Sequence, residues 1–231
     1  MTEALPELVL LPGLDGTGVL FERLQKILPS AVVKVTVIAY PPDASMTYRD
    51  YVALVKGSLG SRRVVLLGES FSGPIAIMLA AEIPEHVRGL ILSATFLRSP
   101  WPRWLVHLGS LIDPSGTPAG ARNTVLMGRS RDTELARTIS NIVAAMPPGV
   151  RAARIQAVSK VDVRTQFAGL ACPILALHDT ADWIVPKRQL EVAIRTMSNA
   201  RWEMIPGAHM LLQTQPKIAA QHILKFIQTL N

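Results

Sequence analysis

The sequence predicts an α/β fold with about six mostly parallel strands, helices on both faces of the sheet and one helical insertion. Short apolar runs rich in β-branched residues alternate with longer helical patterns, as in strand–helix–strand units. Several runs are apolar at successive positions, which is typical of strands covered on both faces. The alternation is interrupted once, over a Pro- and Arg-rich stretch.

The apolar runs predict six strands, which in chain order span 7–12, 32–40, 62–68, 87–94, 172–179 and 200–206. The helical patterns between and after them predict helices at 17–28, 47–59, 72–83, 187–197 and 216–230. Right-handed crossovers are expected between parallel strands, and ligands are expected at the carboxyl ends of those strands.

The interruption covers residues 96–165, where no convincing strand is found. The stretches RDTELARTISNIVAAM and VRAARIQAVSKV within it are helix-like. We therefore expect a helical cap at 96–165, inserted into a core formed by 1–95 and 166–231. The alternative, a long ordinary connection, would be unusual in a compact domain.

Composition limits the class of protein. The 231 residues are 49% apolar and 18% charged, which suits one ordered α/β domain. No apolar stretch approaches the roughly 20 residues that span a bilayer, and Glu3 and Glu7 occupy positions where a signal peptide is basic, so a cytoplasmic protein is expected. The single Cys172 precedes a proline and is expected in the core, and no metal or cofactor is predicted.

The net charge of +7 is concentrated in one segment, because residues 96–165 hold ten basic and four acidic side chains. A basic region can attract nucleic acid, an anionic membrane or an acidic partner. Nucleic acid is disfavoured, because the chain has no nucleic-acid motif and only 5% aromatic residues.

The stretch LLGESFSG places Ser70 at a sharp turn between a buried strand ending at Gly68 and a helix starting near Ser72. Small residues two before and two after the corner avoid steric clashes, and the corner lifts the Ser70 hydroxyl into the open. The alternative is a tight turn without a chemical role. This pattern resembles the nucleophile elbow of the α/β-hydrolase superfamily, usually Gly-x-Ser-x-Gly, with Ser72 in place of the second glycine.

The resemblance implies an α/β-hydrolase fold with Ser70 as nucleophile, and Ser72, expected inside the helix, is the weaker candidate. The chain would begin at the family's third strand. The family's chain order is nucleophile, acid, histidine. LALHDTADWIVP resembles the acid loop and places Asp182 at the acid position, while Asp179 is expected to form a turn.

The stretch MIPGAHMLLQTQP resembles the family's histidine loop and places His209 before the last helix. The other histidines, at positions 86, 107, 178 and 222, fit that context less well. The resemblance further implies an oxyanion hole made by the backbone N–H groups of Phe71 and of Leu14, in LLPGLDGTG. A phosphate-binding loop does not fit there, because neither glycine-rich phosphate motif is present.

The resemblance implies a serine esterase that cleaves small-molecule carboxylic esters of short to medium acyl chain, without a cofactor, through an acyl-enzyme intermediate. It is similar to carboxylesterases and to carrier-protein methyl esterases, whose caps dock an acidic carrier. Alternatives are a carrier- or CoA-linked (thio)esterase and a cofactor-free haloperoxidase or lyase. A non-catalytic binding protein is disfavoured, because no triad member is missing.

Three tryptophans, Trp101, Trp104 and Trp183, are candidates for contacts with substrate. The first two can equally serve to pack the cap onto the core.

Overall fold

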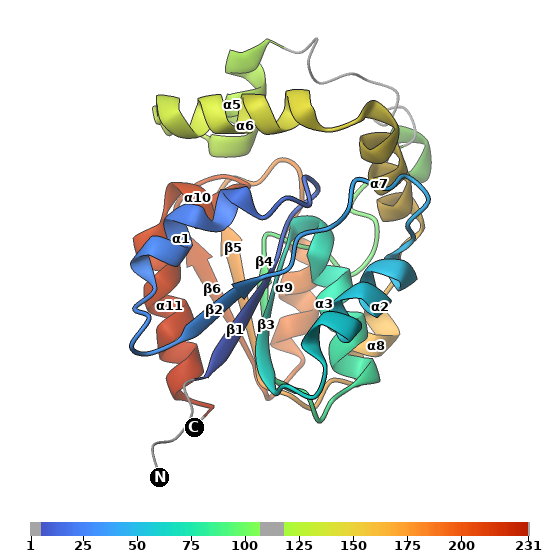
Figure 1. Cartoon of the computed structure of the whole chain (residues 1–231), viewed down its shortest axis with the longest axis vertical. Helices are drawn as coiled ribbons and strands as arrows, with labels where there is room; N and C mark the ends of the chain where they lie inside the picture. The colour runs from blue at the N-terminus through green and yellow to red at the C-terminus, as the bar shows by residue number, and fades with distance from the viewer. Residues whose placement is uncertain (1–5, 107–117, 231) are drawn as a thin grey trace.

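The computed structural model describes residues 6–106 and 118–230, and its centre is a six-stranded parallel sheet (Figure 1). The strands follow the spatial order β2-β1-β3-β4-β5-β6. Their bounds are β1 Glu7–Leu11, β2 Lys34–Val37, β3 Val64–Glu69, β4 Val87–Ser93, β5 Ile174–Asp179 and β6 Ala200–Ile205. The predicted strands and the predicted fold class are confirmed, with strand ends displaced by up to three residues.

Helices cover both faces of the sheet (Figure 1). One face carries the 3₁₀ turn η1 Val19–Phe21 and the helices α1 Glu22–Ile27, α10 Leu211–Thr214 and α11 Pro216–Gln228. The other carries α2 Tyr48–Leu59, the 3₁₀ turn η2 Ser70–Ser72, α3 Gly73–Glu82, α8 Arg164–Ala168 and α9 Arg188–Arg195.

Strand side chains alternate between these two layers. In β1, Leu8 and Leu10 pack in the cluster under α11, whereas Val9 and Leu11 pack in the cluster under α2 and α3. Because both faces are buried, the strands need apolar residues at successive positions, which is the pattern that predicted them.

Three helices, α5 Ala119–Met127, α6 Thr133–Ala145 and α7 Pro148–Lys160, lie over the carboxyl edge of the sheet (Figure 1). The chain leaves and re-enters the core at one place, because Arg98 and Asp162 form an antiparallel bridge and Val163 N–H donates to the Leu97 carbonyl over 2.8 Å. The helix-like stretches expected here appear as α6 and α7. The limits 96–165 stay a prediction, as part of this segment is outside the described residues.

The strand order positions the site. β1 pairs with both β2 and β3, so successive crossovers run in opposite directions from the centre of the sheet. The chain after β1 continues to α1 on one face, and the chain after β3 continues to α3 on the other. This divergence opens a crevice at the carboxyl ends of β1 and β3, where doubly wound sheets bind ligands. No helix in the described residues is both long and apolar enough to cross a membrane.

Two glycines allow α3 to begin directly after β3. A Cβ on Gly68 would lie 2.6 Å from the Ser72 carbonyl oxygen, and a Cβ on Gly73 would collide with the side chain of Thr95. The Thr95 hydroxyl donates to the Ser70 carbonyl over 2.5 Å, so this close approach also supports the turn at the carboxyl end of β3.

We predict opposite effects on stability for alanine at two helical glycines. Gly73→Ala should lower the free energy of unfolding by about 1–3 kcal/mol, because the added methyl overpacks against Thr95. Gly57→Ala, on an exposed face of α2 with open space around it, should raise it by roughly 0.5–1 kcal/mol. Urea unfolding of both variants measures this difference. Equal effects of the two substitutions would contradict the packing argument.

Candidate active site

Ser70 has an unusual backbone conformation at the carboxyl end of β3. Its φ of 48° lies in the left-handed region, and among the described non-glycine residues only Ala94 shares that sign. Such a conformation costs on the order of 1 kcal/mol or more and persists where the surrounding structure enforces it. Here Thr95, at the end of β4, binds the Ser70 carbonyl. The sharp corner expected from the sequence is present.

Asp182, His209 and Ser70 form a hydrogen-bonded chain across three loops. Asp182 follows β5, His209 follows β6 and Ser70 follows β3. His209 Nδ1 lies 2.7 Å from Asp182 Oδ2, and His209 Nε2 lies 2.9 Å from Ser70 Oγ. The second carboxylate oxygen of Asp182 accepts the N–H groups of Ile184 at 2.7 Å and Val185 at 2.9 Å, which fixes the carboxylate in place.

Electrostatics favour an ionised acid beside a basic imidazole. Burial alone would raise the pKa of Asp182, but the hydrogen bond and charge of His209 outweigh it and lower that pKa. Burial alone would lower the pKa of His209, but Asp182 outweighs it and raises that pKa. The pair therefore stabilises a proton on the imidazole, as a general base that draws a proton from Ser70 requires.

Ser72, the weaker nucleophile candidate, has a different environment. Its side chain is fully buried, and its hydroxyl donates to the Pro12 carbonyl and lies 2.6 Å from the Tyr40 hydroxyl. These bonds tie the first turn of the helix to the loop after β1 and to the chain that follows β2. A ligand that reaches Ser70 would meet a buried and already bonded hydroxyl at Ser72.

The residues expected to supply oxyanion donors lie on either side of the crevice. Phe71 follows Ser70 in η2, and Leu14 lies on the loop after β1. In that loop Gly16 N–H donates to the Gly13 carbonyl over 3.1 Å, which closes a turn around Leu14. Both Leu14 and Phe71 line the cavity described next.

A cavity of about 900 Å³ lies above this constellation, between the sheet edge and the helices α5 to α7. Its wall is mostly apolar and includes Leu126, Ile139, Val143, Ile155, Val158 and Val185. Ser70 and His209 also line it, together with the charged side chains of Asp15, Glu69, Arg122 and Arg151. A substrate that reached Ser70 would therefore place its larger part in apolar surroundings.

The three tryptophans differ in position. Trp101 lines the cavity, is 43% exposed and donates its Nε1–H to the Ile184 carbonyl over 2.8 Å. Trp104 and Trp183 are 67% and 76% exposed, and neither is among the described residues that line the cavity. Trp183 lies in the acid loop. The N–H groups of the next two residues, Ile184 and Val185, bind Asp182, and the Trp183 ring points into solvent.

The sequence analysis missed Glu69, a buried acid directly before Ser70. Its side chain is 7% exposed and lines the cavity. It accepts hydrogen bonds from Gln213 Nε2 at 2.8 Å and from the Gly13 backbone N–H. Burial raises the pKa of Glu69 to about 7. The only sequence signal for it is an acid at the end of the apolar run VVLLGE.

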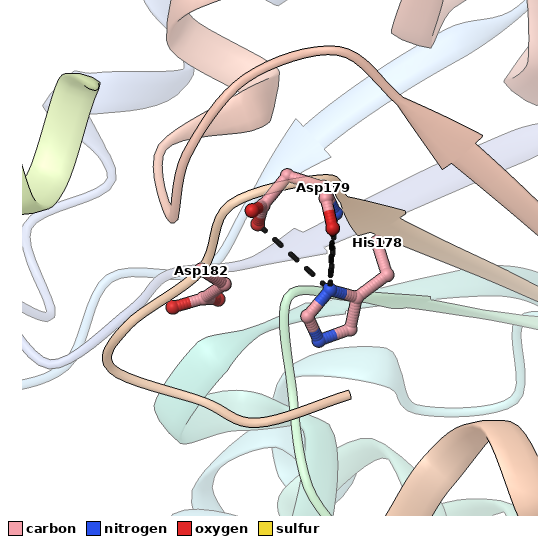
Figure 2. Close-up of side chains that lie close together, drawn as sticks. All are labelled: His178, Asp179 and Asp182. Carbon is pink, nitrogen blue, oxygen red and sulfur yellow. Dashed lines mark hydrogen bonds and ion pairs between the residues drawn. The ribbon is translucent and has the colours of Figure 1, made fainter. Parts of the chain in front are cut away.

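His178 and Asp179 are the last two residues of β5, just before the acid loop, and Figure 2 shows them together with Asp182. These three residues offer ligand atoms within 4.8 Å of one another. However, His178 Nδ1 accepts the Asp179 backbone N–H at 3.0 Å, and Asp182 is bound to His209. A cation here would compete with His209 for Asp182. Asp179 accepts the Ala181 N–H at 3.0 Å, as in the turn that was expected, and burial raises its pKa to about 7.

The chain is similar to known proteins in sequence and in fold. The chain is 28% identical over 159 residues to a pimeloyl-[acyl-carrier protein] methyl ester esterase of Edwardsiella ictaluri (strain 93-146), a match over 63% of this chain and 62% of the relative's length. The fold is similar to the enol-lactonase from Burkholderia xenovorans LB400, with a TM-score of 0.85, 16% identity, and coverage of 98% of this chain and 92% of that one.

Two further solved structures share the fold. An esterase from Exiguobacterium antarcticum gives a TM-score of 0.83 with 16% identity over 96% of this chain and 92% of that one. A bromoperoxidase from Bacillus anthracis gives a TM-score of 0.83 with 17% identity, over 97% of this chain and 92% of that one. The family model described as serine aminopeptidase, S33, matches residues 38–214, most of the chain. The chain has the α/β-hydrolase fold and belongs to this serine aminopeptidase S33 family of hydrolases.

Proposed function

We propose that this protein is a carboxylesterase that works through an acyl-enzyme on Ser70. The observation that carries the proposal is the unbroken chain of hydrogen bonds from Asp182 through His209 to Ser70. A serine hydroxyl becomes a useful nucleophile when a base lies within hydrogen-bond reach and a third group orients that base. The strained corner at Ser70 adds support, because it exposes the hydroxyl at the cavity wall.

In the first half of the proposed reaction, Ser70 Oγ attacks the ester carbonyl carbon while His209 Nε2 takes the hydroxyl proton. The carbonyl π electrons move onto oxygen, giving a tetrahedral oxyanion. When the intermediate collapses, the bond to the alkoxy oxygen breaks and His209 returns its proton to form the free alcohol. Water then attacks the acyl-enzyme by the same path, and the carboxylic acid leaves Ser70.

Two backbone N–H groups, those of Phe71 and Leu14, are the proposed oxyanion donors. Phe71 lies in the 3₁₀ turn that precedes α3, so its N–H is one of the free donors at a helix start. Fixed donors aimed at a developing negative charge are worth about 10²–10³ in rate each.

The cavity favours an ester with an apolar group, and we propose short to medium acyl chains. Its apolar wall would bury alkyl chain at about 0.8 kcal/mol per CH₂, which gives a gain in binding as the chain lengthens. Of the three tryptophans proposed for substrate contact, Trp101 lines the cavity, which supports a contact with such a chain.

A carrier-linked substrate is the second candidate. Arg129, Arg131 and Arg137 are exposed on the segment that lies over the sheet edge, and this segment holds most of the net positive charge. The Edwardsiella relative is an esterase of a carrier-linked methyl ester. A basic surface beside the cavity would attract an acidic carrier protein.

Glu69 adds a titratable carboxyl group to the proposed centre. Its pKa of about 7, against a usual 4.5, means that folding disfavours its ionised form. Each pKa unit corresponds to about 1.4 kcal/mol, so ionising Glu69 in the folded protein costs on the order of 3 kcal/mol. Stability contributed by this group is therefore full below about pH 4.5 and falls as the pH rises toward 7. The side chains of Asp15 and His209 face it and act in opposite directions, since Asp15 raises this pKa and His209 lowers it.

We expect a fluorophosphonate to label the wild type stoichiometrically and Ser70→Ala not at all, because the probe reports an activated serine. Hydrolysis of p-nitrophenyl butyrate by Ser70→Ala should fall by roughly 10³-fold or more. Ser72→Ala should still be labelled, since its hydroxyl is buried. Intact-protein mass spectrometry and a plate assay measure these outcomes. Absence of label on folded wild type would contradict the proposed function.

If the basic segment docks a carrier, salt should affect two substrates differently. Raising ionic strength from about 0.05 to about 0.5 M should lower kcat/KM on an acyl-carrier-protein methyl ester on the order of tenfold, and leave that of the matching free methyl ester nearly unchanged. The double variant Arg129→Gln/Arg131→Gln should reproduce the loss at low salt. Equal salt responses of the two esters would remove the carrier-linked candidate.

Replacing Glu69 by Gln should flatten the dependence of stability on pH between about 5 and 7.5, because the carboxyl that resists ionisation is gone. The Gln213 amide can turn its unpaired Oε1 toward the new side chain, so the hydrogen bonds can be kept. Urea unfolding at several pH values measures the slope. Exposed Glu22→Gln, whose partner is Lys26, is the control and should keep the slope, and an unchanged slope in Glu69→Gln would refute the assignment.

A further inference from the structure

Arg154 joins the segment over the sheet edge to the loop after β1. It extends from α7, is 2% exposed and is the largest fully buried side chain among the described residues. Its guanidinium donates to the Leu14 and Asp15 carbonyls at 2.8 Å each, to the Pro41 carbonyl at 3.0 Å and to the Tyr51 hydroxyl at 3.1 Å. One side chain thus holds two successive carbonyls of the loop that contains the proposed oxyanion donor.

Arg154 is surrounded by carbonyl and hydroxyl acceptors and by two tyrosine rings. Among the described residues no carboxylate forms an ion pair with it. The guanidinium carbon lies 5.7 Å from the ring centre of Tyr51 and 6.0 Å from that of Tyr40. A planar group with five fixed donors suits several carbonyls at once, which a flexible ammonium group cannot match.

The loop approaches the guanidinium of Arg154 most closely at Gly16. A Cβ on Gly16 would lie 2.8 Å from the guanidinium carbon of Arg154, and the φ of Gly16 is +73°. The Gly16 carbonyl accepts Tyr40 N–H at 2.7 Å, so the loop is held on its other side as well. Arg154 and the loop therefore fit together as one packed unit.

From Pro12 to Gly16, each carbonyl of the loop accepts a hydrogen bond. The Pro12 carbonyl accepts the Ser72 hydroxyl, and the Gly13 carbonyl accepts Gly16 N–H at 3.1 Å. The N–H of Leu14 shares a planar trans peptide with the Gly13 carbonyl and so points the opposite way. Arg154 binds the carbonyls of the two peptides that follow, and without it those peptides would lose this partner and the Leu14 N–H would be held from the Gly13 side alone.

We propose that Arg154 is a positioning residue that holds the Leu14 N–H in the oxyanion hole from the segment over the sheet edge. This inference rests on the proposed esterase function and deepens it. As a consequence, the packing of α7 on the loop after β1 is coupled to stabilisation of the transition state, because the Arg154 guanidinium makes the bonds on which both depend. Arg154 touches no reacting atom and acts through the loop backbone alone.

The test compares Arg154→Met and Arg154→Lys with the matched control Lys160→Met, which removes one charge from the exposed end of α7. On p-nitrophenyl butyrate, kcat of Arg154→Met should fall about 10²-fold, near the loss for one oxyanion donor, with KM within about threefold of wild type. Arg154→Lys should recover part of kcat, and Lys160→Met should match the wild type.

A second readout isolates the oxyanion. A trifluoromethyl ketone with a matching chain forms a tetrahedral oxyanion adduct, so its affinity should fall in parallel with kcat/KM in the arginine variants. Thermal unfolding is measured beside it, and if Arg154→Met does not fold, Arg154→Lys carries the test. A folded arginine variant with unchanged kcat and unchanged inhibitor affinity would overturn the inference. If the wild type itself neither hydrolyses the ester nor reacts with the fluorophosphonate, the proposed function is overturned instead.

Discussion

The left-handed backbone of Ser70 is the constraint on which the site depends. A side chain at positive φ is disfavoured, so the neighbouring elements must enforce it. They do so by close approach: Gly68 and Gly73 leave no gap between β3 and α3, and Thr95 binds the Ser70 carbonyl from the next strand. The parallel sheet supplies the rigid frame, because it fixes β3 and β4 side by side over their whole length.

Several polar groups around the crevice are hydrogen-bonded to partners from distant parts of the chain. The loop after β1 is bound by Ser72 from η2 and by Arg154 from α7, and Glu69 is bound by Gly13 and Gln213. A buried polar group without a partner costs about 1–3 kcal/mol, so each of these contacts also restricts where its elements can lie. The same network that keeps the crevice stable therefore holds its backbone groups in one orientation.

The sheet and the candidate residues Ser70, Asp182 and His209 could be predicted from the sequence because their signals are local. The apolar runs around Val9 and Leu66 report two-sided burial, and the elbow, acid-loop and histidine-loop patterns each fit within about a dozen residues. The short helices α5, α8 and α10 were missed, since they carry little periodicity of their own. Glu69 and Arg154 were missed for another reason, because a charged residue is expected at the surface and its burial is decided by partners far along the chain.

The chain leaves the core at Leu97 and re-enters it at the neighbouring Val163, and this arrangement has an evolutionary consequence. The two ends of this segment are hydrogen-bonded to each other. A change in the length or sequence of the segment therefore need not move any strand of the sheet out of register. Such a change would alter the wall of the cavity and leave the sheet as it is. Among its contacts with the core, a transplanted segment would need a donor in the place of Arg154 that binds the loop after β1.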